Sequence, residues 1–151
     1  MTNNNRIAKP FLLLLPILLA ACSNTSIGAQ NAQLKPCPSS PNCVSTDTTN
    51  TKQQLSPFKI KGSASVAWEE LRQQVDLLPR TKIIAVTSEY LHAECRSALF
   101  GFVDDLEFLL RSEQGVIAVR SAARVGYSDF GVNKKRVETL RAALVSQGVI
   151  D

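Results

Sequence analysis

Two neighbouring runs of alternating apolar and polar residues place the strongest constraint on the fold of this chain. In residues 104–111, and again in residues 116–124, apolar side chains recur at every second position, which is the pattern of a strand with one buried face. Residues 112–115 separate the two runs and predict a turn, so the runs form a hairpin. With the ends of this turn facing each other, Glu107 lies directly opposite Arg120, and opposite charges at paired positions favour this register.

The rest of the region from residue 57 to residue 151 completes an α+β pattern. The expected elements are a strand at 58–61, a helix at 64–78, strands at 82–87, 90–98, 104–111 and 116–124, a loop at 125–132 and a helix at 133–147. This order predicts an α+β domain, in which an antiparallel sheet of about five strands carries two helices packed on one face.

The two predicted helices carry recognisable end signals. Ser63 or Ser65 is expected to cap the first helix, and Asn133 is expected to cap the second. Gly148 suits the position just after the last helical turn. Trp68 lies in the apolar stripe of the first helix, so we expect it in the core, although Trp also anchors partners at interfaces.

The first 21 residues resemble a bacterial lipoprotein signal peptide. Arg6 and Lys9 precede an apolar stretch at residues 11–21, which is shorter than the ~20 residues that span a bilayer. Small residues lead directly to Cys22, which is therefore expected to be acylated and to become the first residue of the mature protein. Residues 22–56 are rich in Ser, Asn, Thr and Pro and predict a lipidated tether and an irregular arm. The position of Ser23 is compatible with sorting to the outer membrane, facing the periplasm.

Net charge excludes one class of partner. The chain of 151 residues has a formal charge of +4, but removal of residues 1–21 lowers this to +2. Gross charge therefore gives no reason to expect a polyanion, and no nucleic acid partner is predicted. The single His rules out a multi-histidine metal site within one chain, and no cofactor is predicted.

Four cysteines divide into three roles. Besides Cys22, the pair Cys37 and Cys43 encloses five residues that include two prolines, a spacing that can close a small loop. An exported chain meets an oxidising compartment, so we predict a Cys37–Cys43 disulfide, with pairing to Cys95 as the alternative. Cys95 alternates with polar residues on the apolar side of its strand, which favours a core position.

Three sequence blocks carry a family resemblance. They are Ser40-Pro-Asn-Cys-Val-Ser45, Phe102-Val-Asp-Asp-Leu-Glu-Phe108 and the run from Val119 through Tyr127-Ser-Asp-Phe-Gly-Val-Asn133 to Arg136. In order and spacing they resemble domain-of-unknown-function family 1499, from about Cys37 to Gly148. The resemblance implies an exported, lipidated or membrane-associated bacterial protein, and it implies no particular reaction.

Basic residues around the start of the last helix form the first candidate site. Arg and helix N-termini both bind anions, so this region suggests a site for an anionic ligand, a lipid headgroup or an envelope protein. The residues assigned to it are Arg120, Ser121, Arg124, Asp129, Asn133 and Lys134. The alternative is structural, with Asn133 only capping the helix and Lys134 facing solvent.

Acidic residues form the second candidate site. This site would serve an envelope enzyme, either in general acid–base catalysis or as ligands of a metal ion. Its residues are Asp104, Asp105 and Glu107, together with His92. A solvated sheet face with cross-strand ion pairs is the alternative, and an Arg beside Glu107 would hold that carboxyl ionised. We therefore expect a binding or scaffold domain more than an enzyme, and a purely structural lipoprotein is the third interpretation. The sequence makes no prediction of oligomeric state.

Overall fold

The computed structural model describes Met1 and residues 33–151. Cys22 and, apart from Met1, the signal peptide predicted for residues 1–21 lie outside the described residues. The elements are β1 (Cys43–Ser45), β2 (Phe58–Lys59), α1 (Ala64–Asp76), β3 (Thr81–Val86), β4 (Tyr90–Arg96), β5 (Val103–Arg111), a 3₁₀ helix (Ser112–Gln114), β6 (Val116–Ala123) and α2 (Val132–Ser146).

Six strands form one antiparallel sheet in the order β1-β6-β5-β4-β3, and β2 pairs with the other end of β6. The predicted α+β fold is thereby confirmed, with six strands in place of about five. The additional strand, β1, lies inside the segment expected to be irregular. A strand of three residues is too short to show an alternating pattern, which explains why the sequence did not reveal it.

The predicted hairpin register is confirmed. Glu107 of β5 pairs directly with Arg120 of β6. The turn between these strands is the short 3₁₀ helix, and it ends at Gly115, whose φ of 64° is left-handed. A residue without a Cβ adopts this conformation at little cost, and it directs the chain into β6.

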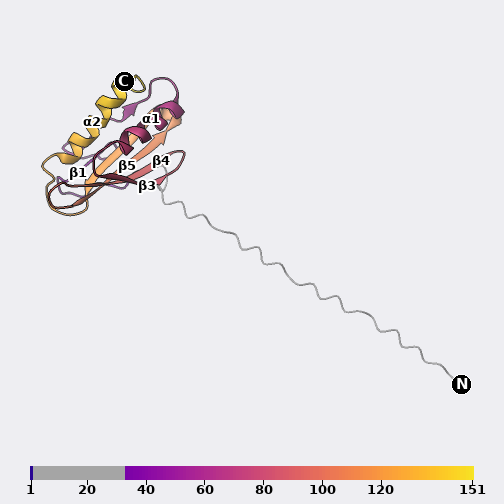
Figure 1. Ribbon diagram of the computed structural model, residues 1–151, viewed down its shortest axis with the longest axis horizontal. Helices are drawn as coiled ribbons and strands as arrows, with labels where there is room; N and C mark the ends of the chain where they lie inside the picture. Colours follow the sequence, from indigo (N-terminus) through magenta and orange to yellow (C-terminus); the bar gives the residue numbers. More distant parts are fainter. Residues whose placement is uncertain (2–32) are drawn as a thin grey trace.

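Both helices cover one face of the sheet, as Figure 1 shows. Apolar side chains of α1 and α2 pack there against those of the strands in one continuous core. Its fully buried members include Leu71, Val75, Leu91, Leu106, Phe108, Ile117, Val119, Val137, Leu140 and Leu144. Trp68 belongs to this core, as expected, and donates its indole hydrogen to the carbonyl of Thr87.

The opposite face of the sheet is partly covered by the arm at residues 33–56. Leu34 packs there with Tyr90, Leu109 and Ala118 in a second, small apolar cluster. Arg111 forms an ion pair with Asp47 of the arm. The arm is therefore an integral layer of the fold, from Leu34 onward. Within the described residues, no helix has the length and apolar character needed to cross a membrane.

The helix ends differ slightly from expectation. Helix α1 ends at Asp76, two residues earlier than predicted. Ser63 does occupy the N-cap position, but its hydroxyl contacts the hydroxyl of Ser65 and makes no bond to the helix backbone. Gly148 follows α2 in the left-handed conformation, as predicted.

Candidate functional site

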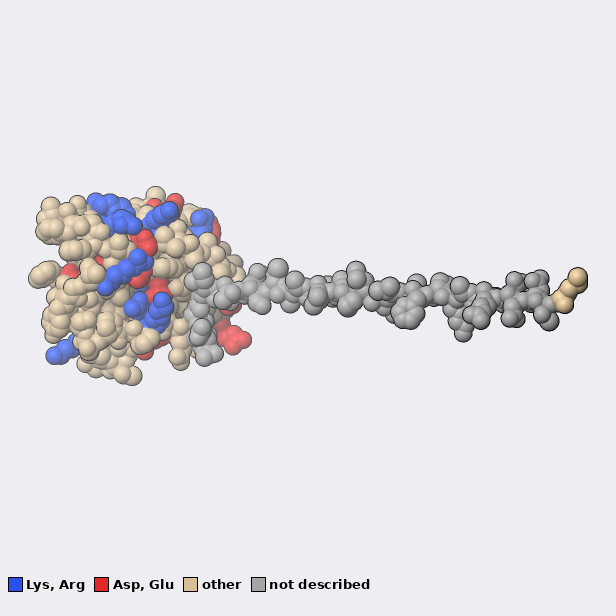
Figure 2. Space-filling model, turned by 90° about the horizontal axis from the view of Figure 1, so that it is seen from below, with Lys and Arg blue, Asp and Glu red and all other residues tan. Residues whose placement is uncertain are grey.

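A polar cluster occupies the sheet face that carries the arm. Paired residues of neighbouring strands share a face, so the register places His92, Glu107 and Arg120 in one row across β4, β5 and β6. Glu94 and Asp105 form the adjacent row. Acidic and basic side chains lie next to one another on the surface, in a narrow stripe, instead of forming separate patches (Figure 2).

Glu107 is the centre of the buried part of this cluster. The hydroxyl of Tyr90 donates to Oε1 of Glu107 at 2.8 Å, and Nη1 of Arg120 donates to Oε2 at 2.6 Å. Glu107 is only 4% exposed and Arg120 only 9%. Burial, followed by the hydrogen bond to Glu107, raises the pKa of Tyr90. The phenol therefore stays a protonated donor, and the carboxylate has a partner on each oxygen.

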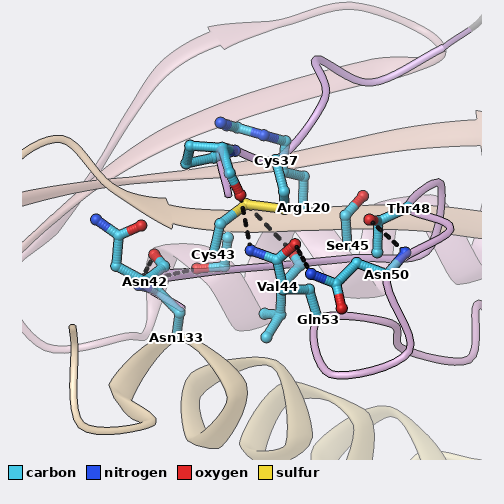
Figure 3. Close-up of a disulfide and its surroundings, with 12 residues drawn as sticks. Cys37, Asn42, Cys43, Val44, Ser45, Thr48, Asn50, Gln53, Arg120 and Asn133 are labelled. Atoms are coloured by element: carbon cyan, nitrogen blue, oxygen red, sulfur yellow. Dashed lines mark hydrogen bonds between the residues drawn. A yellow bond between two sulfur atoms is a disulfide. The ribbon is translucent and has the colours of Figure 1, made fainter. Parts of the chain in front are cut away.

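The arm closes over this pair. Figure 3 shows the disulfide between Cys37 and Cys43 beside Arg120. Within the arm, Nε2 of Gln53 donates to the carbonyls of Pro38 and Ser40 at 2.9 and 2.8 Å. The disulfide tightens the same loop, so the covering layer is held by covalent and polar contacts together.

The cysteine prediction is confirmed for the Cys37–Cys43 pair. Cys95 is a free, buried thiol, as its place on the apolar side of the strand indicated. Burial raises the pKa of Cys95, which makes the thiolate less accessible. The alternative pairing of Cys95 with a cysteine of the arm is therefore wrong.

Arg124 neutralises the exposed part of the cluster. Its Nη2 donates to Asp105 and to Glu94, each at 2.7 Å, and Nε2 of His92 lies 2.8 Å from the same carboxylate of Asp105. Burial alone would raise the pKa of Asp105, but the hydrogen bonds from Arg124 and His92 outweigh it and lower that pKa. Hydrogen bonds to Asp105 and Glu94 raise the pKa of Arg124.

A second polar group lies on the opposite face of the sheet, under α2. The hydroxyl of Ser121 donates to Oδ1 of Asn133 at 2.5 Å, and Arg136 donates to the same oxygen at 2.6 Å. Arg136 also pairs with Asp104 at 2.7 Å. Asn133 donates in turn to the carbonyl of Asn42. These contacts attach the start of α2 to β6, β5 and the arm.

The sheet therefore divides the residues of the predicted anion site. Arg120 and Arg124 lie on the arm face, whereas Ser121 lies on the helix face, where Asn133 of α2 contacts it. Both arginines already bind carboxylates, and Arg120 is buried. The structure does not bring these residues together around a shared space, and both guanidinium groups are paired with acids of the protein, although Arg124 remains partly exposed.

The predicted acidic face is divided in the same way. Asp104 points to the helix side, where Arg136 neutralises it, and only Asp105 and Glu107 share the arm side with His92. Grouping Asp104 with the other two carboxylates was wrong, because adjacent residues of a strand point to opposite faces. In residues 33–151, no three His, Cys, Asp or Glu side chains converge as a group that could hold a metal ion.

The start of α2 is organised by Asp129. Its carboxylate accepts hydrogen bonds from the backbone N–H of Gly131 at 3.0 Å and of Asn133 at 2.8 Å. Asn133 itself lies inside the first helical turn and is buried, so the prediction that it caps the helix is wrong. Lys134 is exposed and forms no ion pair with any residue in the described part of the chain.

One end of the molecule is apolar, which the sequence pattern did not reveal. The β4–β5 loop and the β6–α2 loop meet there, because β5 begins beside the end of β6. The large apolar side chains that these loops expose are Leu99, Phe100, Phe102, Val125, Tyr127 and Phe130. Loops lack the periodicity that predicts burial. Aromatic residues within Gly- and Ser-rich segments were the one feature of the sequence that could have indicated this apolar surface. We call these six residues the apolar end.

Two features of the apolar end are unusual for a protein surface. The rings of Phe100 and Phe102 stack on each other with centroids 5.5 Å apart, and both remain exposed. Phe130 has a φ of 54° and is 96% exposed. The left-handed conformation is costly for a bulky residue, and Phe130 gains no burial in return.

A cleft of about 950 Å³ lies at the opposite end of the sheet. Residues Leu34 and Asp47 of the arm line it together with Arg111 and Glu113 of the β5–β6 turn region. None of the residues of the two predicted sites contributes to its walls. This cleft and the residues of the two predicted sites therefore lie apart.

These observations define a small α+β domain with a disulfide-closed arm, internally neutralised charges and one apolar end. The chain belongs to the family described as Protein of unknown function (DUF1499), whose sequence model matches residues 33–144. This match confirms the resemblance carried by the three sequence blocks. A comparison with curated proteins finds no match.

Proposed function

We propose that this protein is a lipid-anchored component of a bacterial envelope whose domain is a binding module without enzymatic activity. The anchor is supported by the signal-like leader of residues 1–21, which directly precedes Cys22. Oxidising conditions outside the cytoplasm would also suit the Cys37–Cys43 disulfide.

The observation that carries the binding function is the apolar end. Six large apolar side chains on two adjacent loops stay in water in the isolated domain. Contiguous exposed apolar surface of this kind marks interaction sites in soluble domains. The exposed Phe130 adds backbone strain, and strain that no intramolecular contact repays is found at functional positions.

The polar cluster is poorly suited to binding an anion or to catalysis, which leaves the apolar end as the binding surface. An anion that bound Arg120 or Arg124 would have to displace Glu107, Asp105 or Glu94 from hydrogen bonds of 2.6 to 2.7 Å. For a general acid, a carboxyl needs a raised pKa, but the partners of Asp105 lower its pKa. The cluster is therefore better suited to holding three strands and the arm together than to binding or catalysis.

Two measurements test the proposal. First, replacement of Cys22 by Ala should release the protein from the membrane fraction and abolish its acyl mass increment. Unchanged membrane attachment of the Cys22→Ala variant would refute the anchor.

Second, a photo-crosslinking amino acid at Phe100 in the acylated protein should form specific products in intact cells. Val86 is the matched control position, since it is also apolar and 48% exposed but lies on strand β3. Equal products at both positions, or none at Phe100, would contradict a binding role of the apolar end and would favour a purely structural lipoprotein.

A further inference from the structure

Three separate segments contribute to the apolar end and its border. Leu77, at the end of α1, is exposed beside the start of β3, and that start pairs with the end of β4. Val132, the first residue of α2, extends the apolar surface on the other side. The end of the molecule is therefore a surface built from loops and helix termini, and the cleft described above lies at the opposite end of the sheet.

The charges around this surface are predominantly basic. Residues 97–102 contain no charged side chain. The exposed cations at its border that form no ion pair within the described residues are Arg80, Lys134 and Lys135, whereas Arg96 lies 3.4 Å from Glu94. Among the nearby acids, Glu94, Asp104 and Asp105 are engaged by arginines, and Asp129 caps α2. Asp76, at the end of α1, offsets one of the positive charges.

We infer that the apolar end enters the surface of a phospholipid bilayer that contains anionic lipids. Aromatic rings on protruding loops are favourable at the boundary between headgroups and acyl chains. Lysine and arginine side chains around such rings are attracted to the phosphates of anionic lipids.

Chain length is compatible with contact to the membrane that holds the proposed anchor. Gln33 lines the cleft near the end of β5, opposite the apolar end. The nine residues of β5 extend ~30 Å from that end to the apolar end. The segment from Cys22 to Gln33 can span at most ~40 Å, so it is long enough for the apolar end to reach the membrane that holds the anchor. The anchor would also keep the domain at a high local concentration near lipid. This inference rests on the proposed function, because it names the occupant of the same surface.

Vesicle partitioning tests the inference directly. The probe is the chain from residue 22 to residue 151 with Cys22→Ser, which retains every described element of the fold and both apolar clusters. We expect it to co-sediment with vesicles of equal parts phosphatidylglycerol and phosphatidylethanolamine, and less with vesicles of phosphatidylcholine alone. Replacing Lys134 and Lys135 by Gln should weaken binding to the anionic vesicles only.

Phe130→Asn is the most informative variant. Asn tolerates the left-handed conformation, so the fold should be at least as stable as with Phe130. Loss of one inserted aromatic ring should lower the partition coefficient about tenfold. Val86→Ser, at an exposed apolar position outside the apolar end, should leave partitioning unchanged. Equal partitioning of Phe130→Asn and the parent chain, or an equal loss in Val86→Ser, would overturn the inference.

If partitioning is too weak to measure, fluorescence quenching tests the inference. The chain is coupled through Cys22 to a maleimide lipid in vesicles with brominated acyl chains, and Phe130→Trp is compared with Val86→Trp. Quenching confined to Phe130→Trp supports insertion, while quenching of neither or of both overturns it. If these tests exclude the bilayer but Phe100 crosslinks to a protein, the proposed binding function is supported and only the assignment of a lipid partner is refuted.

Discussion

The carboxylate of Glu107 and the guanidinium of Arg120 lie 2.6 Å apart at directly paired positions of β5 and β6, and both side chains are buried. Taking two charges out of water is costly, so such a pair stabilises a fold only while both members are present. The pair therefore acts as a single structural unit, with Tyr90 bonded to its carboxylate and the disulfide of the arm beside Arg120.

We predict strong coupling between these two residues. Arg120→Met should destabilise the domain by about 3–5 kcal/mol, because it leaves Glu107 buried and charged. Glu107→Gln together with Arg120→Met should be less destabilising than Arg120→Met alone, since Gln still accepts from Tyr90. Urea unfolding measures each variant, and additive losses would contradict the coupling. As a control, the exposed pair of Glu69 and Arg72 in α1 should show no measurable coupling.

We predict that Tyr90 stays protonated beyond the range of an ordinary tyrosine. Its pKa is raised, first by burial and then by Glu107, so the folded state favours the neutral phenol. That contribution to stability is complete below the unfolded pKa of ~10 and is lost as pH rises toward the folded value. In a Tyr127→Phe variant, Tyr90 is the single tyrosine left. Its ultraviolet titration should coincide with alkaline unfolding, and ionisation in the folded protein at an ordinary pH would contradict this.

We predict a local role for the disulfide. The Cys37–Cys43 bond closes a loop with a sequence separation of 6, for which chain entropy gives about 2 kcal/mol of stabilisation. Replacing both cysteines by Ala should cost about this amount. Hydrogen exchange should accelerate at the amides of Ser45 and Thr46, which bond to Gln53 and Val119. An equal acceleration throughout β5 would show instead that the disulfide supports the whole sheet.

We predict that Asp129 is the residue that caps α2. Asp129→Ala removes the acceptor for two backbone N–H groups and should cost about 1 kcal/mol. Asp129→Asn retains a capping oxygen and should cost much less. Thermal unfolding distinguishes the two variants, and equal losses would assign the effect to the charge of Asp129 and not to its hydrogen bonds.

The hairpin could be predicted from sequence because two independent signals agreed. Alternation gave the strands, and the opposed charges of Glu107 and Arg120 gave their register. The positions of the helices followed from their apolar spacing. The structure places each of these elements within about two residues of expectation.

The candidate site was harder to predict because it depends on what covers each sheet face. Alternation shows that Ser121 and Arg120 point to opposite sides, but it does not show that the arm covers Arg120 or that Asn133 lies over Ser121. The apolar end was missed for another reason. Phe100 and Phe130 lie in loops, where a hydrophobic residue carries no pattern that distinguishes a buried position from an exposed one.

The pairing of β1 with β6 has a consequence for the order in which the chain can fold. β1 is the first strand of the described chain and β6 is the last, and the contact of Asn42 with Gly126 spans 84 residues. Contacts between such distant residues form late, because a long loop must close first. As the ribosome releases the chain from its N-terminus, the arm has no strand to join until β6 has emerged. The sheet is therefore complete only near the end of synthesis, and under the proposed export the chain would meet a translocation channel before its arm has joined the sheet.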